Sequence, residues 1–118
     1  MTSDRTDDLS TALAEVRRQM TIDPSKAETL ARDILRESLE EPDALLLLAT
    51  ALRKKGAANS ARAILETLLQ TQSQMAPAHY ELGLVLGLLG DNRGATASLR
   101  SAVDLDPGSL YRLIARLA

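Results

Sequence analysis

The sequence predicts an all-α fold of stacked helical hairpins, and two observations carry this prediction. The chain has 118 residues, enough for one domain, and it is rich in helix-forming residues, while aromatic side chains make up only 2% of it. A pattern of small, large and turn-forming residues also recurs every 34 positions, as expected of a helical repeat. The core is therefore expected to be aliphatic, built from leucine, alanine, isoleucine and valine.

The repeat is clearest in residues 78–107, which predict two antiparallel helices. Gly83 has no side chain, so it lets the two helices approach closely. Gly90 predicts that the first of these two helices ends in a left-handed conformation. Ala95 is a small residue at the expected crossing point of the helices, and Pro107 closes the unit.

The same register extends toward the N-terminus, although nothing forces the preceding sequence to obey it. One shift by 34 residues relates five pairs of similar residues: Gly90 and Gly56, Ala95 and Ala61, Leu99 and Leu65, Leu82 and Leu48, Gly83 and Ala49. A second shift relates Ala61 to Ala27, Leu69 to Leu35 and Leu68 to Ile34. Three hairpins therefore share one period. We expect a single domain over 1–118, with repeats at roughly 8–41, 42–75 and 76–109.

The first helix is expected over about 8–20, after a disordered or frayed segment at 1–7 that has nothing to bury. The strict 34-residue shift would place Glu15 at the close-packed small position, where an unpaired carboxylate is costly. We therefore expect one extra residue in the following turn. Leu13 and Ala14 then take the places of Leu82 and Gly83.

The second helix is expected to begin at Asp23-Pro24, because proline is tolerated in the first turn, and to end near Ser38. Ser25 and Glu28 are an alternative capping box for its N-terminus. The next four helices are expected at about 43–55, 58–72, 77–89 and 93–105.

The final segment, 109–118, predicts an amphipathic helix that caps the open end of the stack. Its apolar residues are Leu110, Leu113, Ile114 and Leu117. Alternatively, Tyr111, Ile114 and Ala115 resemble the opening of a fourth hairpin after a shorter loop.

Composition argues against several functional classes. The chain has no cysteine and a single histidine, His79, so we predict no enzyme, no cofactor and no metal site. His79 is expected to be a partly buried packing residue.

The net charge of −2 gives no reason to expect nucleic acid or an anionic membrane as partner. The longest apolar run, at 44–49, is too short to span a bilayer, and no signal peptide is recognisable, so we expect a cytoplasmic protein.

Four basic residues lie close together around one predicted turn: Arg53, Lys54, Lys55 and Arg62. Cations at the C-terminal end of a helix are favoured by the helix dipole, which explains the cluster without a ligand. An anion-binding site is the alternative.

The residues Leu82, Gly83, Ala95, Leu99 and Pro107 give the chain a pattern that resembles the tetratricopeptide repeat. The resemblance implies a right-handed α-α superhelix of about three helical hairpins plus a C-terminal capping helix. It also implies a non-catalytic protein–protein interaction module, in which the first helices line a concave groove that binds a peptide or protein segment.

The groove positions of that family correspond to Leu46, Thr50, Arg53, Lys54, Tyr80, Leu84 and Leu88, together with Gly87. These residues predict an apolar floor with basic groups at one edge. The expected ligand is an amphipathic helix or extended peptide with apolar anchors and an acidic end near Arg53 and Lys54. One subclass of the family clamps a chaperone carboxylate, but Leu47, Pro77 and Glu81 stand at the corresponding positions, which disfavours that activity.

The stretches PDALLLLATALRKKG, ARAILETLL, APAHYELGLVLGLLGD and SLRSAVDLDP are also similar to the N-terminal repeat segment of some bacterial sulfotransferase-family proteins. That resemblance implies an alternative function, an accessory domain of a larger enzyme. A self-associating scaffold, in which the groove or the terminal helix packs on a second copy, is a further alternative.

Overall fold

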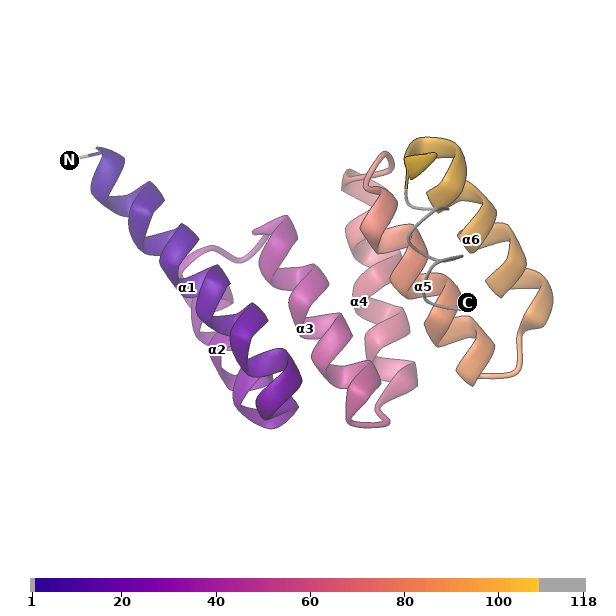
Figure 1. The fold of residues 1–118 in the computed structure, drawn as a ribbon, viewed down its shortest axis with the longest axis horizontal. Coiled ribbons are helices and arrows are strands. Elements are labelled where there is room, and N and C mark those ends of the chain that lie inside the picture. Colours follow the sequence, from indigo (N-terminus) through magenta and orange to yellow (C-terminus); the bar gives the residue numbers. More distant parts are fainter. Residues whose placement is uncertain (1, 109–118) are drawn as a thin grey trace.

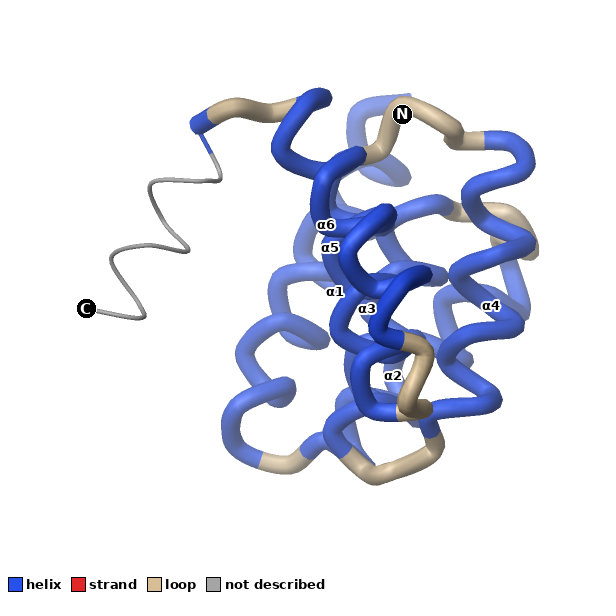
Figure 2. The backbone as a smooth tube through the Cα atoms, turned by 90° about the vertical axis from the view of Figure 1, so that its right-hand side faces the viewer, coloured by secondary structure: helices blue, strands red, loops and turns tan. Residues whose placement is uncertain are grey.

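The computed structural model describes residues 2–108, which form helices and short loops without a strand (Figures 1 and 2). The expected capping helix at 109–118, and the alternative fourth hairpin there, lie outside the described residues. The helices are α1 (Thr2–Ile22), α2 (Pro24–Glu37), α3 (Pro42–Lys54), α4 (Ala58–Thr71), α5 (Ala76–Leu88) and α6 (Asn92–Leu105). For α3 to α6, each predicted end lies within one residue of the observed end.

Consecutive helices pair into three hairpins, which follow one another along the long axis of the molecule (Figure 1). The first helices of the hairpins also touch one another, since α1 contacts α3 and α3 contacts α5. Among the described elements, the second helices α2, α4 and α6 share no such contacts. The result is an inner layer of α1, α3 and α5 with an outer layer of more widely separated helices.

The predicted glycine stops occur at the turns of the second and third hairpins. Gly56 and Gly90 have φ angles of +86° and +85°, which only glycine adopts without strain. The residue after each glycine donates its backbone N–H five residues back, from Ala57 to Leu52 at 2.8 Å and from Asp91 to Leu86 at 2.9 Å. This Schellman arrangement ends α3 and α5 in the same way.

The three alanines expected at equivalent positions have equivalent surroundings. Ala27 and Ala61 are fully buried, and Ala95 is 9% exposed. Each donates its backbone N–H to the carbonyl oxygen four residues earlier, at 3.0, 3.1 and 2.9 Å respectively. Those carbonyls belong to Asp23, Ala57 and Asp91, which are the N-caps of α2, α4 and α6. The 34-residue register is therefore confirmed for the second helix of every hairpin.

The core is aliphatic, as expected. Its largest fully buried side chains are Val16, Leu65, Leu68 and Val85, contributed by α1, α4 and α5. Small residues fill the space between them, so the helices approach closely without aromatic rings.

Two glycines of α5 provide a test of this close approach. A Cβ atom at Gly83 would lie 2.7 Å from Cγ of Leu99 and 3.2 Å from the carbonyl oxygen of Ala95, whereas at Gly87 it would meet only the Cβ of Ala95 at 4.0 Å. Gly87→Ala is expected to raise the free energy of unfolding by about 0.5–1 kcal/mol through helix propensity. Gly83→Ala gains the same propensity but forces Leu99 aside, so we expect a net loss of about 1 kcal/mol.

Urea denaturation followed by circular dichroism measures both changes under the same conditions. Equal stabilisation by the two substitutions would show that Leu99 yields freely and that Gly83 is not needed for the α5–α6 contact.

The N-terminal region differs from the prediction in two respects. The segment at 1–7 was expected to be disordered or frayed, but residues 2–7 are helical, because α1 begins at Thr2. No proline or glycine interrupts this stretch, so each added residue extends the packed helix by one backbone hydrogen bond at little nucleation cost. In addition, the turn between α1 and α2 is one residue, Asp23, where an extra residue was expected.

The packing of α1 differs accordingly. Leu13, Val16 and Met20 are buried, but Ala14 is exposed and does not take the place of Gly83. Because α1 runs on to Ile22 without a glycine stop, its apolar stripe meets α2 in a different register. Glu15 remains at the surface of the helix, where hydrogen bonds from Arg18 and Gln19, at 2.8 and 3.0 Å, lower its pKa to about 2.

Candidate peptide-binding surface on α3 and α5

The residues predicted to line a groove lie on two neighbouring helices of the inner layer. Leu46, Thr50, Arg53 and Lys54 are on α3, and Tyr80, Leu84 and Leu88 are on α5. Spacings of three and four residues place each set on one side of its helix. We call these seven residues the α3–α5 face.

Most of this face is apolar and half-buried. Leu46, Tyr80 and Leu84 are partly accessible, and Leu88 at the end of α5 is 64% exposed. The hydroxyl group of Thr50 donates to the carbonyl oxygen of Leu46 at 3.0 Å, so its proton already takes part in a hydrogen bond within α3. The members of the face on α5, Tyr80, Leu84 and Leu88, are all aromatic or alkyl.

Arg53 is held in an ion pair across the face. Its Nε lies 2.7 Å from Oε2 of Glu81, and a terminal guanidinium nitrogen lies 3.3 Å from Oε1. The side chains of Arg53 and Glu81 are only 21% and 11% exposed. The pair links α3 to α5, and hence the second hairpin to the third.

Sequence reasoning did not identify this partnership. It considered Glu81 only as a departure from the chaperone-binding pattern. The available signal was that the two positions lie on adjacent first helices, and that charged residues are costly at buried positions unless they pair.

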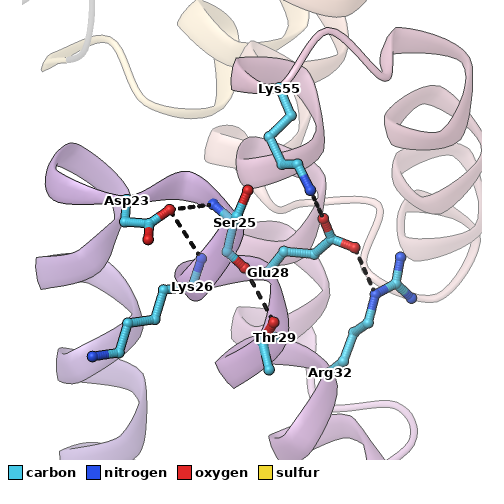
Figure 3. Close-up of polar contacts among 7 residues, drawn as sticks. All are labelled: Asp23, Ser25, Lys26, Glu28, Thr29, Arg32 and Lys55. Atoms are coloured by element: carbon cyan, nitrogen blue, oxygen red, sulfur yellow. Dashed lines mark hydrogen bonds and ion pairs between the residues drawn. The ribbon is translucent and has the colours of Figure 1, made fainter.

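A second ion pair links the first hairpin to the second (Figure 3). Nζ of Lys55, just beyond α3, lies 2.6 Å from Oε1 of Glu28 on α2, and Nε of Arg32 lies 2.9 Å from Oε2. The hydrogen bonds from Lys55 and then Arg32 lower the pKa of Glu28. This carboxyl group is therefore ionised throughout the neutral range.

The same region settles how α2 begins. The carboxylate of Asp23 accepts hydrogen bonds from the backbone N–H groups of Ser25 and Lys26, at 3.1 and 3.3 Å (Figure 3). The alternative capping box of Ser25 and Glu28 is wrong, because the Glu28 carboxylate turns instead to Lys55 and Arg32.

The basic cluster is largely neutralised by these contacts. Arg53 pairs with Glu81, Lys55 with Glu28, and Arg62 with Glu66 at 3.1 Å. Lys54 is exposed, and no ion pair joins it to another residue in the part of the chain that the structure describes. The face therefore offers one accessible cation instead of the basic edge that was expected.

His79 lies beside the face but points to the preceding loop. It is half-buried, and its Nε2 lies 2.9 Å from the carbonyl oxygen of Ser73. This contact ties the start of α5 to the loop after α4, in keeping with a packing role. Within residues 2–108, no group of three or more histidine, cysteine or acidic side chains is placed to hold a metal ion.

One exposed feature away from the face was not anticipated. Leu39, in the loop between α2 and α3, is 78% exposed. It borders two shallow depressions of about 460 and 310 Å³. The larger is lined by loop residues 38–42, and the smaller by Arg32, Leu35 and Arg36 together with Leu39.

Three stacked antiparallel hairpins, two of them with equivalent glycine turns, define a helical-repeat fold, and comparison with known proteins gives the repeat that it resembles. Residues 76–109 match the tetratricopeptide repeat. The crystal structure of MamA superposes with a TM-score of 0.74 and 20% sequence identity, covering 90% of this chain and 63% of that chain. At this identity the likeness concerns the fold, a right-handed α-α superhelix.

The remaining comparisons give no further relative. None of the curated proteins matches the sequence. The resemblance to a sulfotransferase segment has no support from the matching repeat or from the similar structure. Among the described helices, none has the length and apolar character needed to cross a membrane.

Proposed function

We propose that this chain is a non-catalytic interaction module whose α3–α5 face binds a segment of a partner protein through apolar anchors. Tetratricopeptide repeats generally mediate protein–protein interaction, and one repeat of this chain matches that family. The observation that carries the proposal is the exposure of Leu88, one turn beyond Leu84 and two turns beyond Tyr80 on the same side of α5. The cytoplasmic location expected from the sequence remains a prediction.

The chemistry of the face suits an amphipathic helix or an extended peptide. Each apolar side chain that the ligand buries there releases water at about 25 cal/mol per Å² of apolar surface. The ring of Tyr80 supplies a large contact area at a low cost in side-chain entropy, while its hydroxyl group can take part in orienting the ligand. A few such anchors usually dominate the binding energy of an interface.

Selection from a random peptide display library tests the proposal without a known partner. The wild-type chain is expected to enrich peptides with spaced apolar residues, and the variant Tyr80→Ala/Leu84→Ala is expected to bind them at least about tenfold more weakly. Leu39→Ala is the matched control, because it removes an exposed leucine outside the face. Circular dichroism checks that both variants retain their helix content.

Binding that survives Tyr80→Ala/Leu84→Ala would reject this assignment of the face. Light scattering distinguishes the alternative, self-association through the same surface. A dimer that Tyr80→Ala/Leu84→Ala dissociates, formed by a wild-type chain that selects no peptide, would favour the scaffold over the module.

A further inference from the structure

We infer that Glu81 determines the ligand specificity of the α3–α5 face. By holding the guanidinium group of Arg53, it makes the face select an uncharged apolar segment over one that presents a carboxylate. This inference rests on the proposed function and specifies the class of ligand that the same surface takes.

The geometry of the pair explains the exclusion. Guanidinium and carboxylate meet through two nitrogen–oxygen contacts, at 2.7 and 3.3 Å, which is the fork arrangement that gives such pairs their strength. Glu81 already neutralises the guanidinium charge and occupies two of its nitrogens, so a ligand carboxylate could form the same fork with Arg53 only by displacing Glu81. That would leave Glu81, a residue with 9% exposure, as an unpaired charge in a poorly solvated position.

The other cations around the face do not replace Arg53. Lys55 is held by Glu28 at 2.6 Å, and Arg62 by Glu66 at 3.1 Å. The exposed Lys54 ammonium is well hydrated, and pairs made by such groups contribute little and are screened by salt. The acidic ligand end expected near Arg53 and Lys54 therefore finds no strong partner.

The pair is also not a requirement of the repeat. Shifting by 34 residues relates Arg53 to Gly87 and to Gln19, and Glu81 to Leu47. The contact between α1 and α3 has no such pair, because no ion pair joins these two helices among the described residues. Neighbouring helices of the inner layer can therefore stack without a charge pair, so the charges at the α3–α5 boundary are free to serve recognition.

The experiment compares peptide selection on the wild-type chain and on Glu81→Gln, with the same library at the same salt concentration. Glu81→Gln releases the Arg53 guanidinium, so its selected peptides are expected to be enriched in aspartate and glutamate. The affinities of one selected peptide and of its Asp-to-Asn counterpart then measure the preference for a carboxylate directly. Glu81→Gln is expected to prefer the acidic peptide by about tenfold at low salt, and the wild-type chain by less than about twofold.

The double variant Arg53→Gln/Glu81→Gln is the control for the origin of this preference. It lacks the guanidinium, so the gain in acid preference is expected to disappear. A preference that persists would come from Lys54 or another cation and would overturn the inference. Should Glu81→Gln lose its helix content, Glu81→Leu removes the same carboxylate with the residue that Leu47 already places at the equivalent position.

The outcomes separate the inference from the function on which it rests. If neither the wild-type chain nor Glu81→Gln selects peptides beyond the background of Tyr80→Ala/Leu84→Ala, the proposed function fails and the inference fails with it. If both select peptides of the same acid content, the face binds peptides but Glu81 does not set their charge.

Discussion

Truncation of Leu65 to alanine is expected to lower the free energy of unfolding by about 3 kcal/mol. Leu65 lies on α4, is fully buried, and belongs to the aliphatic core shared by the first five helices. Its removal costs the transfer energy of the lost methyl and methylene groups and leaves a cavity that rigid neighbouring helices cannot close. Urea denaturation monitored by circular dichroism measures the change.

Leu99→Ala is the matched control, because Leu99 occupies the equivalent position one repeat later. It is only half-buried, whereas Leu65 is fully buried on α4, which packs against both α3 and α5. We expect Leu99→Ala to cost about 1–2 kcal/mol. Equal costs for the two truncations would mean that the third hairpin adds little to the burial of the second.

Enlargement of Ala61 is expected to have the second largest effect. Ala61 is fully buried where α4 packs against its neighbours, and it is equivalent to Ala27 and Ala95. A leucine there must push the helices apart or adopt a strained rotamer, so Ala61→Leu should destabilise the chain by about 2–3 kcal/mol. The midpoint of urea denaturation reports this loss.

Ala63→Leu controls for the substitution itself, since Ala63 is on the same helix but exposed. Its effect should remain within about 0.5 kcal/mol. A tolerated leucine at Ala61 would contradict the view that small residues at 34-residue intervals permit the helix crossings.

The bounds of the last four helices could be predicted from the sequence because the signals that end and begin them are local. Gly56 and Gly90 adopt the left-handed conformation at the turns, and each is followed within two residues by the next helix. The first hairpin lacks such a glycine. Its turn and the packing position of Ala14 were accordingly predicted wrongly, and α1 also begins earlier than expected.

The candidate site could be predicted in position but not in chemistry. The repeat period places Leu46 with Tyr80 and Lys54 with Leu88 at equivalent points of α3 and α5, and both helices lie in the inner layer. Whether Arg53 is available to a ligand depends on Glu81, which is 28 residues away. No local pattern indicates that pairing.

The 34-residue period by itself determined the class of fold, the positions of the small residues at the helix crossings and the two glycine turns. Each of these depends on the conformation of a few neighbouring residues and therefore repeats with the sequence. Only the tertiary structure decided which charges meet, through Glu28 with Lys55 and Arg53 with Glu81. Such pairs depend on how one hairpin is set against the next, and that arrangement results from packing summed over whole helices.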